Sequence, residues 1–297
     1  MSALEAPGFW EMPDELDGFL ADQLIKRRIA LVLGAGVSNG VGLPDWKELV
    51  RRLYESKSDT PNPNHSPEQA SEAFYCKHFK GQDKAFSEQV RNVLYDGAIL
   101  DPTSLGSHAL LNAIGSILTA STRGSAGYAI TFNYDDLLEL HLRYRGFVVN
   151  PVHELPAWNK ETDMTVLHAH GYLPSDKSSA TSKGIVLTRM DYDRVIGNSA
   201  NFWNQRMLDI FRSHTCIFLG LSGDDPRLTS LMLTAKEQHR SRLDNHAFWG
   251  VRAVASDTDP TNDVWTARGV FCRSLGSYSN IPDWLFNICR IAAQKRA

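Results

Sequence analysis

The chain has only four cysteines, and none of them belongs to a Cys-x-x-Cys pair. They are spread along the sequence at Cys76, Cys216, Cys272 and Cys289. A disulfide framework needs a denser set of cysteines, and a structural zinc ribbon needs closely spaced pairs. We therefore expect buried, unreactive thiols and no metal site.

An excess of one charge and long apolar runs are lacking as well. Lys and Arg number 31 against 34 Asp and Glu, and the formal net charge of −3 gives no general attraction to nucleic acid. No apolar run approaches the roughly 20 residues that span a bilayer. Glu5 and Glu11 lie where a secretory signal would be basic or apolar. We expect a cytoplasmic protein without direct contact to nucleic acid or membrane.

Short apolar runs that alternate with helical patterns predict an α/β fold. Residues 29–33 form a continuous apolar run, as expected for a central parallel strand covered on both faces. Other predicted strands cover residues 128–132, 148–152, 165–168, 216–219 and 247–254. The predicted helices cover residues 14–28, 46–54, 68–79, 85–94, 107–119, 136–142 and 227–238.

This alternation predicts a Rossmann-like parallel sheet flanked by helices. The 297 residues fit a single domain that carries an inserted lobe. We expect the core to cover approximately residues 14–45 and 124–297, with an inserted helical lobe at approximately 46–123.

A glycine-rich loop, Gly34-Ala35-Gly36-Val37-Ser38, follows the first apolar run. Glycine permits close approach of a pyrophosphate to backbone N–H groups, although the same pair also occurs in simple tight strand ends. The next glycine is Gly40, so the spacing departs from Gly-x-Gly-x-x-Gly. A ribose-binding acid about 20 residues further on is missing as well. Both departures count against an ordinary dehydrogenase.

The second polar loop is Thr131-Phe132-Asn133-Tyr134-Asp135. Ligands of open α/β sheets bind at the carboxyl ends of the strands, where Asn133 and Asp135 can point into one crevice. The alternative is that these side chains cap the helix at residues 136–142.

The third polar loop contains His168-Ala169-His170-Gly171. A histidine at a strand end can act as a general base, because its ordinary pKa lies near neutrality. His168 is alternatively a hydrogen-bonded core residue. Two histidines at this spacing share one face and could hold a metal, but no further ligand has suitable spacing.

The fourth polar loop is Gly220-Leu221-Ser222-Gly223-Asp224-Asp225. It can hold ribose or phosphate through Ser222 and backbone amides. The alternative is a helix start with Asp224 or Asp225 as its cap.

Taken in order, these loops resemble the signature motifs of the sirtuin superfamily. Gly34-Ala35-Gly36-Val37-Ser38 and Gly42-Leu43-Pro44 are similar to its Gly-Ala-Gly-(Ile/Ala)-Ser…Gly-(Ile/Leu)-Pro signature. The loop of residues 131–135 is similar to its Thr-x-Asn-(Ile/Tyr)-Asp motif. His170-Gly171 matches its catalytic His-Gly, and Gly220-Leu221-Ser222 resembles its later Gly-x-Ser loop.

The departures from the family pattern favour a subgroup. The protein deacylases carry a zinc lobe with two Cys-x-x-Cys pairs, which this chain lacks. Tyr134 replaces isoleucine, and His170 follows Asn133 after fewer residues than in the deacylases. These traits are similar to bacterial sirtuin-like NAD⁺ hydrolases of antiphage defence, such as the Thoeris effector and the sirtuin–HerA pairs.

The resemblance implies that NAD⁺ is the substrate and that no metal takes part. It implies that NAD⁺ cleavage yields nicotinamide and ADP-ribose, with Asn133 and Asp135 gripping the nicotinamide and the attacking water and His170 accepting a proton. The residues that it implies for dinucleotide binding are Gly34, Ala35, Gly36, Ser38, Pro44, Thr131, Gly220, Ser222 and Asp225.

Two other functions stay open at this point. The chain could be a regulatory subunit that binds NAD⁺ or ADP-ribose, or it could transfer ADP-ribose to, or remove acyl groups from, a protein. An unregulated NAD⁺ hydrolase would be toxic to its host. We therefore expect a homo-oligomer, a regulatory partner such as a HerA-type ATPase or another sensor, or both.

Overall fold

The computed structural model describes residues 8–154, 161–179, 181–182, 184–198, 201–243 and 248–297, with 240–243 as backbone only. Within these residues, seven strands form one parallel sheet in the order β3-β4-β2-β1-β5-β6-β7. The strands are β1 (Ile29–Leu33), β2 (Tyr128–Thr131), β3 (Val149–Val152), β4 (Met164–His168), β5 (Thr215–Leu219), β6 (Gly250–Val254) and β7 (Val270–Ser274). The predicted fold class, a Rossmann-like parallel sheet flanked by helices, is confirmed.

The central strand β1 is buried along its whole length, which explains its continuous apolar sequence. Its side chains alternate between the two faces of the sheet. Leu31 and Leu33 belong to one hydrophobic core, whereas Ala30 and Val32 belong to the other.

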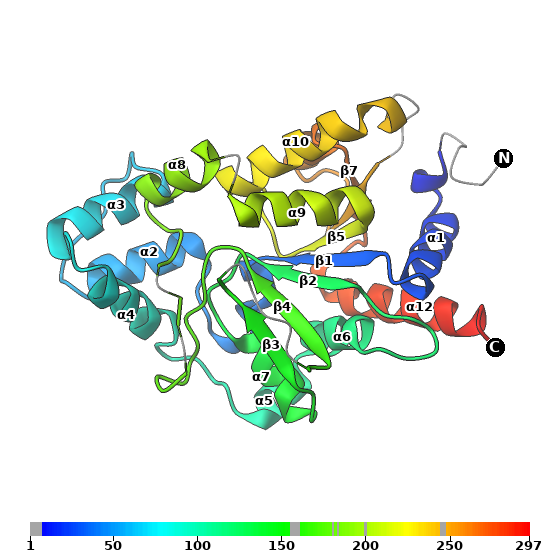
Figure 1. Cartoon of the computed structure of the whole chain (residues 1–297), viewed down its shortest axis with the longest axis horizontal. Coiled ribbons are helices and arrows are strands. Elements are labelled where there is room, and N and C mark those ends of the chain that lie inside the picture. The colour runs from blue at the N-terminus through cyan, green and yellow to red at the C-terminus, as the bar shows by residue number, and fades with distance from the viewer. Residues whose placement is uncertain (1–7, 155–160, 180, 183, 199–200, 244–247) are drawn as a thin grey trace.

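Each face of the sheet is covered by its own layer of helices (Figure 1). One layer contains α1 (Pro13–Ile25), α6 (Ala109–Leu118), α7 (Leu137–Tyr144) and α12 (Ile281–Gln294). The other contains α9 (Phe202–Ser213), α10 (Pro226–Leu243) and α11 (Asn262–Ala267). Because both faces are covered, a ligand can reach the sheet only at its edges.

A group of helices stands beyond the carboxyl edge of the sheet, at the left of Figure 1. It consists of α2 (Trp46–Glu55), α3 (Pro67–His78) and α4 (Asp83–Leu94), and α8 (Arg189–Gly197) packs against α3. α6 packs against α12 in the layer that covers the sheet. The segment predicted as a lobe, residues 46–123, therefore contains the helices α2, α3 and α4 beyond the carboxyl edge and also α6, which covers the sheet.

Several elements differ from the sequence predictions. The first helix begins at Pro13 and ends at Ile25, and the helix predicted at 107–119 is α6, which follows a short helix that was not predicted, α5 (Pro102–Ser107). They are separate because His108 is extended and its Nδ1 caps α6, accepting from Leu111 N at 3.2 Å. β7, α8, α9, α11 and α12 were not predicted. None of the helices in the described segments is long and apolar enough to cross a membrane.

Candidate active site

A cavity of about 650 Å³ opens at the carboxyl edge of the sheet. It is lined by the loops after β1, β2, β4 and β5 and by the first residues of α2 and α3. The chain continues from β1 toward β2 on one side and from β5 toward β6 on the other, so the cavity lies at the topological switch point. Its volume falls within the ~300–1,000 Å³ of typical small-molecule pockets.

The structure brings almost all of the sequence-predicted site residues to this one cavity. Those in its lining are Gly34, Ala35, Gly36, Ser38, Pro44, Asn133, Asp135, His170, Gly220, Ser222 and Asp225. Thr131 is the exception, because its side chain is buried and its Oγ1 accepts from Asn133 N at 3.1 Å. Thr131 holds the loop that carries Asn133, and its contact with the dinucleotide stays a prediction.

The glycines of the first and fourth loops pack the two loops against each other. Gly36 N donates to Gly220 O at 3.0 Å, and a Cβ on Gly36 would lie 2.7 Å from Gly220 Cα. A Cβ on Gly34 would lie 2.6 Å from Gly220 O. Gly220 itself has a φ of +67°, a conformation that favours glycine. The close packing of the first loop on the fourth therefore requires glycine at these positions. The sequence alone did not predict this requirement.

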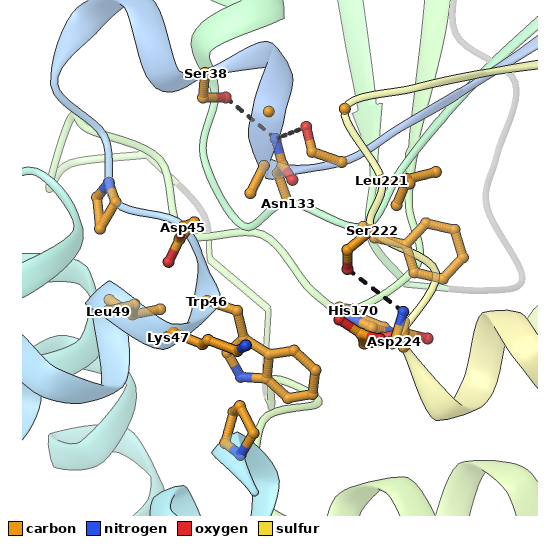
Figure 2. A pocket seen from close by; sticks show the side chains of 18 of the residues that line it. Ser38, Asp45, Trp46, Lys47, Leu49, Asn133, His170, Leu221, Ser222 and Asp224 are labelled. Carbon is orange, nitrogen blue, oxygen red and sulfur yellow. Dashed lines mark hydrogen bonds and ion pairs between the residues drawn. The ribbon is translucent and has the colours of Figure 1, made fainter. Parts of the chain in front are cut away.

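Asn133 ties the first two loops together (Figure 2). Its Nδ2 donates to Gly34 O at 3.2 Å and to Ser38 Oγ at 3.1 Å. Ser38 Oγ in turn donates to Asp135 Oδ2 at 3.2 Å. None of the described residues donates to Oδ1 of Asn133, so this oxygen is free to accept a hydrogen bond from a ligand.

Asp135 is a buried carboxylate at the cavity wall. Burial raises its pKa to about 6, and the nearby charges of Glu139 and Asp136 add to the effect. Asp135 Oδ1 also accepts from Leu137 N at 3.1 Å, so the helix-cap interpretation holds for this residue as well. At neutral pH the cavity wall therefore carries a poorly solvated negative charge.

His168 is a core residue, as the alternative interpretation predicted. It is fully buried, and its Nε2 lies 2.6 Å from Glu139 Oε1. Burial alone would lower the pKa of His168, but the Glu139 carboxylate raises it overall. In the described part of the chain no group of three or more potential metal ligands occurs.

His170, in contrast, lines the cavity. It is 3% exposed and lies between the ring of Phe132, 4.8 Å away at 87°, and that of Tyr192, 5.4 Å away at 89°. Burial lowers the pKa of His170 to about 4, although the Asp225 carboxylate opposes this shift. At pH 7 the imidazole is neutral and able to accept a proton.

The fourth loop begins α10, and Asp225 caps this helix. Asp225 Oδ1 accepts from Leu228 N at 2.7 Å, which confirms the capping alternative for this residue. Its Oδ2 faces the site, with Tyr192 OH at 2.8 Å and His170 Nε2 at 3.4 Å. Ser222 is exposed, and its Oγ accepts from Asp224 N at 3.4 Å.

Several residues of the cavity wall were not predicted from the sequence. Tyr192 of α8 is 2% exposed and packs on Trp46, with ring centroids 5.7 Å apart. Lys47, Glu68 and Leu221 also line the cavity. Tyr192 belongs to an ordinary amphipathic helix and carries no motif, so no sequence signal singled it out.

Fold and cavity define an α/β protein with a candidate ligand site at the carboxyl edge of a parallel sheet. Within it, residues 128–272 match the family model described as SIR2-like domain. The match begins at β2 and ends within β7, so it includes Asn133, Asp135, His170 and Asp225 and leaves out the glycine loop after β1. It supports a sirtuin-like relationship.

Solved structures of Sir2 proteins resemble the chain as well. One of Sir2 enzymes is 15% identical and covers 94% of this chain and 98% of its own, with a TM-score of 0.48. A complex of a SIR2 homolog with NAD is 16% identical and covers 96% and 95%, also with a TM-score of 0.48. A complex of a mutant Sir2 homologue with ADP ribose is 17% identical and covers 93% and 96%, with a TM-score of 0.45. No curated protein matches the chain.

Proposed function

We propose that this protein cleaves the nicotinamide–ribose bond of NAD⁺ and releases nicotinamide and ADP-ribose. The observation that carries the proposal is the joint presence of Asn133, Asp135 and a neutral His170 in one cavity beside two packed glycine loops. The match to a SIR2-like domain and the NAD complex of the SIR2 homolog support the choice of ligand.

In this proposal the glycine loops bind the ADP part of the substrate. Gly34, Ala35, Gly36 and Ser38 lie on one side of the cavity, with Gly220, Ser222 and Asp225 on the other and Pro44 at its wall. Backbone N–H groups of such loops bind phosphate oxygens. Held in this way, the dinucleotide would have its nicotinamide end near Asn133 and His170.

The reaction itself breaks the bond between the ribose C1′ and the nicotinamide nitrogen. The bonding electron pair leaves with the nicotinamide, and positive charge develops on the ribose ring. The Asp135 carboxylate would stabilise this charge, because it is poorly solvated and therefore interacts strongly. Asn133 Oδ1 would hold the carboxamide or the attacking water.

Water then supplies the new C1′–O bond. Its proton passes to the imidazole of His170, which is neutral at pH 7, and is released to solvent afterwards. The base is covered by Phe132 and Tyr192 and is only 3% exposed, which favours a small acceptor such as water over a protein side chain.

The test is NAD⁺ consumption by the purified chain, followed as nicotinamide and ADP-ribose release. Asn133→Ala should lower the rate by about 10²–10³-fold, the usual effect of losing one preorganised polar contact. Asn133 also bonds Gly34 and Ser38, so the thermal midpoint of the variant must be measured alongside.

Asn92→Ala is the matched control, because Asn92 lies exposed on α4. An Asn133→Ala variant that cleaves NAD⁺ at the wild-type rate contradicts the proposal. NAD⁺ binding without turnover supports instead a module that senses NAD⁺ or ADP-ribose.

We further propose that the activity serves antiphage defence and is controlled by self-assembly or by a regulatory partner such as a HerA-type ATPase or another sensor. In infected cells the wild-type chain should deplete NAD⁺ and Asn133→Ala should not. Equal NAD⁺ levels in both cultures contradict the defence role.

A further inference from the structure

The carboxylate of Asp225 has both oxygens engaged by different elements. Oδ1 accepts from Leu228 N at 2.7 Å, so the first turn of α10 fixes one side of the group. Oδ2 accepts from Tyr192 OH at 2.8 Å and lies 3.4 Å from His170 Nε2. One carboxylate oxygen therefore accepts from a phenol and also faces the histidine of the cavity.

The start of α8 places Tyr192 at this position. Thr188 caps the helix, and its side chain and that of Asp191 bond reciprocally across the first turn. Tyr192 N donates to Thr188 O at 3.1 Å, so the tyrosine is fixed within that turn. Its ring lies between Trp46 and His170 and is 2% exposed. In this position its hydroxyl donates to Asp225 Oδ2 at 2.8 Å.

The other groups around His170 complete its surroundings. Arg227 of α10 is 1% exposed, and its NH1 donates at 2.6 Å to the carbonyl oxygen of Ala169, the residue before the histidine. Asp225 and Tyr192 face the ring from α10 and α8, and Phe132 covers it from the loop after β2. His170 Nε2 accepts or donates no hydrogen bond within the described segments.

We propose that Tyr192 is a positioning residue for His170 and acts through Asp225. Its hydroxyl fixes the carboxylate that faces Nε2 and takes up part of the negative charge of Oδ2. The imidazole then keeps its single proton on Nε2, toward Asp225, and accepts the second proton on Nδ1. A carboxylate that orients a basic histidine is a general solution in hydrolytic sites. The inference rests on the proposed function, because it assigns His170 as the base.

The first test reads the imidazole directly and does not depend on turnover. The protein is labelled with ¹⁵N in its ten histidines, and the His170 signals are assigned by their loss in His170→Gln. We expect the Nε2–H tautomer in the wild type. Tyr192→Phe leaves Oδ2 to the histidine alone and should raise the pKa of His170 by about one unit. Asp225→Asn still caps α10 but removes the charge, and it should lower this pKa further.

The matched control is Tyr75→Phe. Tyr75 OH donates to Asp83 Oδ1 at 2.5 Å on α3 and α4, away from the cavity lining, so its loss removes a similar tyrosine–aspartate bond. It should leave the His170 titration unchanged. A His170 titration that is the same in Tyr192→Phe as in the wild type, or that moves in the same direction in Tyr192→Phe and Asp225→Asn, overturns the proposal.

The second test uses NAD⁺ cleavage. Tyr192→Phe should lower kcat about tenfold, as expected for the loss of one net hydrogen bond, with KM within about twofold of the wild type. Its acid limb should move to higher pH, together with the pKa of His170. A lower kcat with an unchanged acid limb means a merely structural tyrosine and overturns the proposal. If the wild type shows no cleavage, the proposed function fails, whereas the titration still decides whether Tyr192 sets the state of His170.

Discussion

The two histidines at the carboxyl end of β4, His168 and His170, lie in opposite environments. On the side of α7, His168 is fully buried against Glu139, 2.6 Å away, and its pKa is raised overall. On the side of α8 and α10, His170 is 3% exposed at the cavity, 3.4 Å from Asp225, and burial lowers its pKa to about 4.

The difference comes from what each carboxylate does besides facing a histidine. Glu139 gives its close Oε1 to His168, and its Oε2 finds no partner among the described residues. Asp225 is already shared between a helix N–H and the hydroxyl of Tyr192. The Glu139 carboxylate, 2.6 Å away, raises the pKa of His168, whereas the shared Asp225 carboxylate, 3.4 Å away, does not offset the burial that lowers the pKa of His170.

His170→Gln removes the proposed base, and among these variants it has the largest expected effect. Removal of the base should lower kcat for NAD⁺ cleavage by about 10²–10⁴-fold. The free energy of unfolding at pH 7 should fall by far less, because the substitution removes no hydrogen bond of Nε2 and only the ring contacts with Phe132 and Tyr192. Steady-state kinetics and urea unfolding measure the two effects. A variant that keeps its kcat removes His170 from the mechanism.

His168→Ala should destabilise the fold by breaking the buried pair of His168 and Glu139. It leaves the Glu139 carboxylate buried without its partner, and this should cost about 3–5 kcal/mol of unfolding free energy. The double variant Glu139→Gln/His168→Gln should lose less, because no buried charge is left unpaired. Urea unfolding of all three proteins provides the measurement. If the single and double variants are equally destabilised, the buried pair is not what holds His168.

Asp135→Asn, at the cavity wall, should raise the stability of the protein and lower its activity. The pKa of Asp135 is raised from 3.8 to about 6, so its charge costs the folded state stability above that pH. Neutralisation should therefore stabilise the protein by roughly 2–3 kcal/mol at pH 7 and at the same time reduce NAD⁺ cleavage. Asp176→Asn, on the surface, should leave cleavage unchanged. A less stable Asp135→Asn protein would show that its bond to Ser38 outweighs the cost of the charge.

The pH dependence of stability sharpens the comparison further. The folded pKa of His170, about 4, lies below its ordinary 6.5, so its contribution is complete above about 6.5 and is lost as the pH falls toward 4. His168 has a raised pKa, so its contribution is complete below 6.5 and is lost as the pH rises through its folded value. Between pH 7 and pH 5, His170→Gln should lose roughly 2 kcal/mol less than the wild type. Parallel losses in both proteins contradict the low pKa of His170.

The sequence predicted the central strands because they are buried on both faces and read as continuous apolar runs. β7 was missed because only Val270 in it is fully buried, so its pattern is weak. α12 was missed although its apolar spacing was present, at Ile281, Trp284, Leu285 and Ile288. This spacing of three and four residues is the signal of an amphipathic helix.

The candidate site was predicted where a polar residue directly follows a strand. Asn133, His170 and Asp225 all reach the cavity for this reason. Tyr192 could not be predicted, because its place depends on how α8 packs on α3 and α10. The need for glycine at 34 and 220 depends on a contact between loops far apart in the chain.

The most direct test of the central claim is a product balance for the purified chain incubated with NAD⁺. The account predicts nicotinamide and ADP-ribose in equal amounts, with both products almost absent in His170→Gln and Asn133→Ala. If NAD⁺ binds in the cavity and stays intact, or if both variants release products at the wild-type rate, the assignment as an NAD⁺-cleaving enzyme is contradicted.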